Sequence, residues 1–263
     1  MQENRLKDLA TAVLAEINQT SRPASEVLNT FTRTHRFLGA KDRRFLTETV
    51  WRVLRQKARL TYRYPNASLR EQIDLSEQSV PVSDDMPKAV QWEVPAWLPA
   101  HINQPETELP ALLETPPIVL SANGRREEIQ QTLKSEGIET GPAALSPYGL
   151  ILQKRVNLNN SLCYRQGLIE VQDEGSQLSA MQAGIQAGDN VLDYCAGAGG
   201  KSLIFAQLMQ NNGKILAHDV SARSLKELNK RATRAGVSII ETTTNLPAWQ
   251  KSHPEVQWTH VVV

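Results

Sequence analysis

Three glycines mark the place where the chain leaves a predicted strand and enters a predicted helix. Gly197, Gly199 and Gly200 follow the strand expected at 191–193 and precede a helix expected from Lys201. Because glycine has no Cβ, the backbone there can turn sharply and come close to a ligand. The amide N–H groups at the start of a helix are free to donate to that ligand. The spacing therefore predicts a nucleotide-like ligand at the carboxyl end of the strand.

Three kinds of nucleotide-binding loop compete for such glycines, and the neighbouring residues separate them. A phosphate-binding P-loop needs a glycine where Cys195 stands, although residues 200–202 match its end. A dinucleotide loop that starts at Gly197 needs glycine or alanine where Ser202 stands. A methyltransferase loop of the form D-x-x-x-G-x-G-G fits from Asp193 without an exception.

An acidic residue completes this pattern. Asp219 ends the next predicted strand, roughly 20 residues past the loop, where an acid can accept hydrogen bonds from two ribose hydroxyls. S-adenosylmethionine has a free ribose diol and no phosphate, so these residues favour it as the ligand. The alternative is a tight turn with a surface aspartate and no ligand.

The elements that position this loop form a regular series. Over 166–263, short apolar strands alternate with helices, which predicts the α/β class with a parallel, doubly wound, Rossmann-like sheet. Strands are expected at 169–171, 191–193, 215–217, 237–240 and 259–263, and helices at 173–183, 201–209 and 221–235.

The preceding residues are organised differently. Residues 1–70 have the apolar periodicity of a small helical bundle, and no glycine or proline interrupts 41–64, where its third helix is expected. Recurrent prolines make 71–94 a linker. Residues 95–165 are predicted to form a small α+β unit with strands near 118–120 and 150–152.

Charge is distributed unevenly along the chain. Residues 1–70 hold 14 Lys/Arg against 6 Asp/Glu, a net of +8, whereas the rest holds 15 against 22, a net of −7. A row of arginines on the third helix is suited to lie along phosphates, namely Arg44, Arg52, Arg55 and Arg59. The basic segment indicates a polyanion partner, with nucleic acid the leading candidate, and the alternative is an ordinary solvated helix face.

Two stretches closely resemble the Sun-type (RsmB-like) RNA (cytosine-5)-methyltransferases. Residues 171–178 read V-Q-D-E-G-S-Q-L against the family's V-Q-D-E-x-S-Q-L. Residues 191–202 contain D-Y-C-A-G-A-G-G-K-S against D-x-C-A-A-P-G-G-K-T, with Gly197-Ala198 replacing Ala-Pro. Residues 116–123 resemble the family's P-P-x-x-L-R-V-N entry into an RNA-recognition-like unit, and the helical start is similar to a NusB-like RNA-binding domain in general character.

The resemblance implies a cofactor site and the absence of a catalytic one. S-adenosylmethionine would be bound by Asp219 and by the backbone of the loop, which comprises Cys195, Ala196, Gly197, Ala198, Gly199, Gly200 and Lys201. Asn245 falls near the family's adenine-contacting acid. The family's catalytic cysteine lies in a D-A-P-C-S motif that directly follows a strand like residues 260–263. This sequence does not contain that motif. Cys195 matches the cofactor-loop cysteine instead, so its thiol is expected to be buried, and no catalytic residue is assigned.

The sequence is thus identified as a member of that family, truncated before its catalytic motif. The predicted fold is an incomplete Rossmann-like methyltransferase domain over 166–263, preceded by the RNA-recognition-like unit and the helical bundle. The expected activity is methylation of cytosine C5 in RNA, rRNA before tRNA, and the 263-residue chain alone is expected to be inactive. The alternatives are a catalytically inactive RNA-binding protein and a methyltransferase with another substrate. Two cysteines and no long apolar run predict a cytoplasmic protein without membrane contact. A monomer that holds no metal is also expected.

Overall fold

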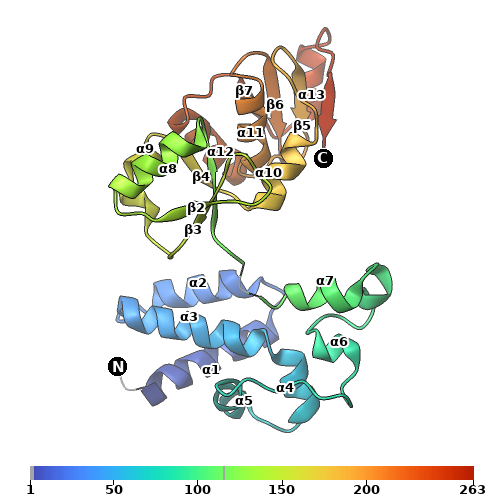
Figure 1. Ribbon diagram of the computed structural model, residues 1–263. Coiled ribbons are helices and arrows are strands. Elements are labelled where there is room, and N and C mark those ends of the chain that lie inside the picture. The colour runs from blue at the N-terminus through green and yellow to red at the C-terminus, as the bar shows by residue number, and fades with distance from the viewer. Residues whose placement is uncertain (1–2, 115) are drawn as a thin grey trace. The chain divides into compact units, whose positions relative to one another are not determined.

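The structure is a computed structural model that describes residues 3–114 and 116–263. It divides into two compact units, residues 1–115 and 116–263 (Figure 1). No helix within the described ranges is both long enough and apolar enough to cross a membrane.

The first unit is helical throughout. Its elements are α1 (Glu3–Gln19), α2 (Ala24–Thr34), α3 (Ala40–Leu54), α4 (Lys57–Arg63), α5 (Leu69–Ser76), α6 (Lys88–Gln91), the 3₁₀ turn η1 (Leu98–His101) and α7 (Pro105–Ala111). Its core is built from apolar positions at helical spacing on α1 and α3, with Val13, Leu46 and Val50 fully buried. Ile73 and Val80 belong to the same core, so the helical unit continues through the expected linker at 71–94 and past residue 95.

The third helix is shorter than expected. Instead of running to residue 64, it ends at Leu54, and α4 begins at Lys57. Gln56 lies in the break with its amide turned inward, where Nε2 donates to the Ser76 carbonyl at 3.1 Å and Oε1 accepts from the Val80 amide at 2.7 Å. These hydrogen bonds to residues 76 and 80 favour the break at Gln56, and the local sequence gives no sign of them.

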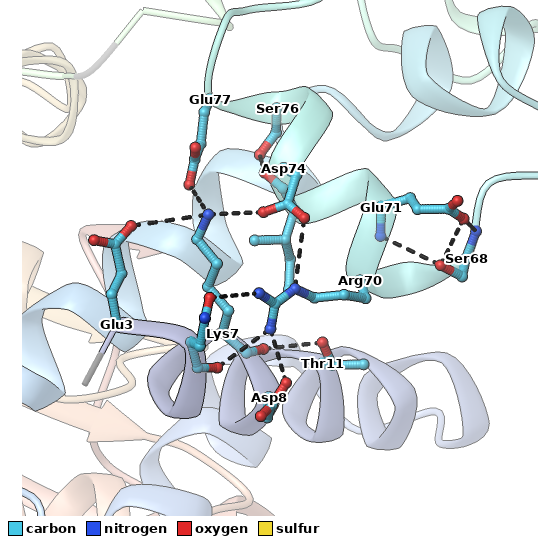
Figure 2. Close-up of polar contacts among 12 residues, drawn as sticks. Glu3, Lys7, Asp8, Thr11, Ser68, Arg70, Glu71, Asp74, Ser76 and Glu77 are labelled. Atoms are coloured by element: carbon cyan, nitrogen blue, oxygen red, sulfur yellow. Dashed lines mark hydrogen bonds and ion pairs between the residues drawn. The ribbon is translucent and has the colours of Figure 1, made fainter. Parts of the chain in front are cut away.

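A polar cluster joins the first and fifth helices of this unit. Figure 2 shows Lys7 of α1 reaching Asp74 of α5 at 2.7 Å and Glu77 at 2.6 Å. Arg70 of α5 reaches back to Asp8 of α1 at 2.7 Å. The Lys7 side chain is only 9% exposed, so its charge is compensated inside the interface between the two helices.

The second unit contains two sheets. The first is antiparallel with strand order β2-β3-β1-β4 and comprises β1 (Val119–Ala122), β2 (Thr140–Pro142), β3 (Gly149–Leu152) and β4 (Ile169–Val171). Its helical elements are α8 (Arg126–Ser135), η2 (Leu158–Asn160) and α9 (Leu162–Arg165). The strand expected to open the parallel sheet, 169–171, pairs instead with β1, so the antiparallel sheet reaches beyond the predicted boundary at residue 165.

The second sheet is parallel, with strand order β7-β6-β5-β8. It comprises β5 (Asn190–Asp193), β6 (Lys214–His218), β7 (Ile240–Thr243) and β8 (His260–Val262). The helices are α10 (Glu174–Met181), α11 (Gly200–Leu208), α12 (Ala222–Arg234) and α13 (Leu246–Ser252). The α/β, Rossmann-like fold of this part is confirmed, although β7 begins at Ile240, where the predicted strand was to end.

Alternating residues of the central strands face opposite helices. Val191 and Ile215 pack with α10 and α11, and Ala217 packs with α12. Leu192 and Leu216 pack with Leu246 and Trp249 of α13 on the other face. A strand buried on both faces has no polar alternation, which is typical of parallel sheets.

The backbone just before β4 closely approaches the end of α12 at Gly167. Its φ is +70°, and a Cβ added there would lie 2.4 Å from both the Ala235 Cα and the Arg234 carbonyl oxygen at the end of α12. Only a residue without a side chain fits between these backbone atoms.

Candidate functional site

The glycine loop connects β5 to α11 at the carboxyl edge of the parallel sheet. Gly197 has φ +55° and Gly199 has φ +82°, values in the left-handed region that favours glycine. A Cβ on Gly199 would lie 2.4 Å from Cγ of Leu228 on α12, so that helix packs directly against the loop. A Cβ on Gly197 would meet nothing within 4 Å. One side of the loop is therefore packed, and the other is open.

Asp219, which directly follows β6, contacts this loop at the Gly197 amide. One carboxylate oxygen accepts from the Gly197 amide at 2.8 Å and the other accepts from the Ser221 amide at 2.8 Å. The structure thus brings together the loop and the acid that the sequence placed on successive strands. A carboxylate has about four acceptor positions, so Asp219 retains the capacity to accept from a ligand.

Asp193, the first residue of the loop motif, points into the protein. It is 2% exposed, and its carboxylate accepts a hydrogen bond of 2.6 Å from the Ser202 hydroxyl. Burial raises the pKa of Asp193, and the Ser202 hydrogen bond opposes that shift. Its role in this geometry is to tie the end of β5 to the first turn of α11.

The loop also presents free hydrogen-bond donors. Within the described part of the chain, no hydrogen bond uses the backbone N–H groups of Cys195, Ala198 or Gly200. A cavity of about 180 Å³ adjoins two of these residues, Cys195 and Gly200. Its other lining residues are Gln172, Ser176, Asp193, Ala196 and Lys201. Sites for small molecules usually measure about 300–1,000 Å³, so this cavity has room for part of a ligand. Free donors beside a carboxylate suit a ligand that has both acceptors and hydroxyls, as S-adenosylmethionine has.

A larger hollow of about 990 Å³ lies in the helical unit, between residues 64 and 81. It is open to solvent, and its walls contain no cysteine, histidine, lysine or arginine. Size alone does not make it a site, so the candidate site stays at the glycine loop.

Two of the expected cofactor residues behave differently from the expectation. The prediction that the Cys195 thiol is buried is wrong, because Cys195 is exposed on the loop. Asn245 is exposed, and its Oδ1 accepts from the Ala248 amide at 3.1 Å, which makes it the N-cap of α13. No hydrogen bond joins Asn245 to the loop among the residues described.

The run 172–177 connects the two sheets and positions α10 beside the loop. Asp173 caps α10 by accepting from the Gly175 amide at 2.8 Å. Glu174 accepts from the amides of Leu145 and Ser146, and the fully buried Gln177 accepts from the Ser146 hydroxyl at 2.6 Å. These contacts give the motif a structural role that its spacing alone did not show.

Sequence reasoning missed the ion pairs behind the loop. Arg231 of α12 donates to the Ala198 carbonyl at 2.7 Å and to Glu170 of β4 at 3.0 Å. Arg234 also pairs with Glu170. The only signal in the sequence was that the helix after Asp219 carries two arginines three residues apart. This signal is weak, because the partner of both arginines, Glu170, lies more than 60 positions away.

The predicted row of arginines on the helical unit is largely occupied by protein partners. Arg59 pairs with Glu93 at 2.9 Å and is 12% exposed, Arg52 lies 3.7 Å from Glu77, and Arg44 pairs with Glu48. Of the four, Arg55 alone makes no side-chain hydrogen bond or ion pair with the described residues. The row as a whole is therefore not a free surface for phosphates.

The two cysteines differ in their burial and their chemistry. Cys163 is fully buried, and burial, reinforced by the nearby Glu136 carboxylate, raises the pKa of its thiol to about 11. Within residues 3–114 and 116–263, no group of three or more His, Cys, Asp or Glu side chains is arranged to hold a metal ion.

Comparison with known proteins places this geometry among methyltransferases. Residues 180–256 match the family model described as 16S rRNA methyltransferase RsmB/F. A probable ribosomal RNA small subunit methyltransferase B of Bacillus subtilis (strain 168) is 28% identical over 158 residues, which are 59% of this chain and 35% of that protein. A 28S rRNA (cytosine-C(5))-methyltransferase of Mus musculus is 34% identical over 123 residues, which are 46% of this chain and 26% of that protein.

A solved structure shows the same fold. A methyltransferase homologue from Pyrococcus horikoshii superposes with a TM-score of 0.58 at 20% identity, covering 68% of this chain and 62% of that one. The chain spans about a quarter to a third of the length of the two curated relatives.

Proposed function

Since this chain belongs to the RsmB/F (Sun-type) family of methyltransferases, we propose that it binds S-adenosylmethionine and is part of an enzyme that methylates C5 of cytosine in ribosomal RNA. The names of the relatives support rRNA as the substrate class, and the geometry of the loop supports S-adenosylmethionine as the ligand. The observation that carries the cofactor proposal is the contact between Asp219 and the Gly197 amide beside three free loop donors.

The chain's own residues would bind and orient the cofactor. The N–H groups of Cys195, Ala198 and Gly200 donate to its acceptor atoms, and Asp219 accepts from its ribose hydroxyls. The cofactor supplies an electrophilic methyl group. Asn245 remains a candidate for the adenine contact, because a carbonyl oxygen that already caps a helix has a second lone pair.

We assign no nucleophile for the cytosine ring to this chain. Methylation through a cysteine adduct needs a thiolate within reach of C6. The Cys163 thiol is buried with its pKa raised to about 11, which keeps it protonated at neutral pH. Cys195 stands in the cofactor loop itself, at the place of the cofactor-loop cysteine that the resemblance indicates. The chain alone is therefore proposed to bind the cofactor without transferring its methyl group.

The cofactor proposal is tested by calorimetric titration of S-adenosylmethionine into the wild-type chain, Asp219→Ala and Asp189→Ala. Asp189 is the matched control, because its carboxylate accepts from the Gln186 amide at 2.7 Å at the opposite end of β5. A charged hydrogen bond contributes about 1.5–3 kcal/mol, so Asp219→Ala should bind at least about tenfold more weakly. Asp189→Ala should bind like the wild type. Absence of binding by the wild type, or equal binding by Asp219→Ala, contradicts the proposal.

The assignment of the cysteines is tested by methyl transfer. The chain is incubated with tritiated S-adenosylmethionine and rRNA or tRNA transcripts, and both radioactivity in RNA and covalent protein–RNA adducts are measured. No transfer and no adduct is expected. Transfer with an adduct at Cys195 would show that the loop cysteine is the nucleophile, and transfer to tRNA alone would replace rRNA as the substrate.

A contact surface for RNA is proposed at the corner between α2 and α3. Arg33, Arg36 and Lys41 are exposed there and form no ion pair with described residues, and the Phe37 side chain beside them is 56% exposed. Cations suit phosphates, and an exposed aromatic ring suits an unstacked base. The same surface is also expected if the protein binds RNA but has no catalytic activity.

Binding of an rRNA fragment at several salt concentrations tests this surface. Replacing the three cations by alanine should lower the slope of log K against log[salt] by about 2–3. The matched control replaces Arg22, Arg44 and Arg70, three cations of the same unit that already pair with carboxylates. A lack of RNA affinity even at low salt would favour a methyltransferase with another substrate.

A further inference from the structure

We infer that Arg231 is a positioning residue for the cofactor loop, which it fixes by joining the Ala198 carbonyl to Glu170 of the antiparallel sheet. This inference rests on the proposed function. Asp219 contacts the same loop one residue earlier, where it accepts from the Gly197 amide. The loop would then be held at two neighbouring residues, by an acid that contacts the ligand and by an arginine that does not.

The contacts of Arg231 are close and sheltered from water. Its Nη1 donates to the Ala198 carbonyl at 2.7 Å, and its Nε donates to Oε2 of Glu170 at 3.0 Å. The exposed fractions of the two side chains are 13% and 9%. A guanidinium is planar and always charged, so it can address two acceptors at a fixed angle. Three elements meet at this one group: α12, β4 and the loop.

The position of Ala198 explains why this contact matters. Ala198 lies between Gly197 and Gly199, both in the left-handed region, so its two neighbours restrict the backbone less than other residues would. A peptide unit is planar, and fixing the Ala198 carbonyl also fixes the direction of the Gly199 amide. That amide donates to the Ala196 carbonyl at 2.9 Å and closes the turn. Arg231 therefore sets the shape of the turn whose free N–H groups face the ligand.

Arg234 provides an internal comparison. It pairs with the same Glu170, but its guanidinium lies over the ring of Tyr164, 4.3 Å from the centroid. Among the described residues, no hydrogen bond or ion pair joins its side chain to the loop. The two arginines share the helix, the partner and a low exposure. They differ in the contact to Ala198.

Amide hydrogen exchange without ligand tests the inference directly, on the full chain. In Arg231→Met the Gly199 amide should exchange at least about tenfold faster than in the wild type, whereas in Arg234→Met it should exchange at the wild-type rate. Both variants lose a pair to Glu170, so both should melt at lower temperature. Equal effects of the two variants on the Gly199 amide, or no effect of Arg231→Met, would overturn the inference. If Arg231→Met does not fold, Arg231→Lys keeps the charge beside Glu170 and is compared with Arg234→Lys in the same way.

Cofactor titration separates this inference from the proposed function. Arg231→Met should bind S-adenosylmethionine at least about tenfold more weakly, and Arg234→Met within about twofold of the wild type. A wild-type chain that does not bind the cofactor refutes the proposed function, while the exchange of the Gly199 amide still decides the role of Arg231. Binding by the wild type together with equal losses in the two methionine variants refutes the inference alone.

Discussion

At the scale of single residues, Gly199 is constrained twice. Its φ of +82° costs a residue with a side chain about 1–2 kcal/mol, and its Cβ would overlap Leu228. Overpacking of this kind adds about 1–3 kcal/mol. Gly199→Ala should therefore lower the free energy of unfolding by about 2–5 kcal/mol, measured by urea denaturation.

Gly197→Ala is the control for this prediction. Gly197 has φ +55°, but nothing lies within 4 Å of its added Cβ, so only the backbone cost of about 1–2 kcal/mol remains. A Gly199→Ala variant as stable as Gly197→Ala would mean that Leu228 moves aside at little cost.

The cysteines should differ in reactivity by location. Cys195 is exposed, whereas Cys163 is fully buried with the pKa of its thiol raised to about 11. Because the thiolate is the reacting species, a disulfide reagent at pH 8 should modify one thiol of the native protein rapidly. Cys195→Ser should abolish that fast phase and Cys163→Ser should leave it. A rapid reaction of two thiols in the native wild type would contradict the burial of Cys163.

At the scale of elements, Lys7 joins α1 to α5 through Asp74 and Glu77 (Figure 2). The hydrogen bond from Lys7 lowers the pKa of Asp74 below its ordinary 3.8. An acid with a lowered pKa stabilises the fold above that ordinary value, and the stabilisation is lost as the pH falls below it. Since Asp74 is 49% exposed, solvent screening limits the contribution to about 1 kcal/mol.

Lys7→Met should thus lower the free energy of unfolding by about 1 kcal/mol at pH 7. Its difference from the wild type should shrink as the pH is lowered from 4 to 2. Arg44→Met is the control, because the Arg44–Glu48 pair is solvent-exposed and its loss should leave stability unchanged. A difference independent of pH would mean that Lys7 contributes through the packing of its stem and not through its charge.

The elements also show what local sequence can and cannot predict. Strands and helices next to the loop were predictable, because apolar runs, the Asp173 cap and the glycines are local signals. The partner of β4 was not, since a three-residue strand carries no information on which sheet it joins. The Gln56 break and the Arg231–Glu170 pair depend on residues 24 and 61 positions away. The shape of the loop was thus predictable, whereas the contacts that hold it in place, such as those of Arg231, were not.

At the scale of the molecule, the two units have separate cores. Calorimetry should therefore resolve two unfolding transitions. Leu46→Ala should lower the unfolding free energy of the helical unit alone, and Leu216→Ala that of the second unit alone. Each loss should be about 2–5 kcal/mol, because both side chains are fully buried.

The cofactor distinguishes the same two transitions. At a concentration of 100 times its Kd, S-adenosylmethionine should stabilise the second unit by about 2.7 kcal/mol and leave the helical unit unchanged. A single transition that both substitutions shift would show that the units unfold together.

Gly167 and Gly199 differ in the kind of atom, backbone or side chain, that excludes a Cβ at each position. The side chain that excludes a Cβ at Gly199 belongs to Leu228, so a smaller residue at 228 can relieve that contact. At Gly167 the excluding atoms are the backbone of Arg234 and Ala235, which no substitution removes. Among relatives with this arrangement of sheets, we expect position 199 to covary with 228, whereas position 167 has no compensating partner and should stay glycine.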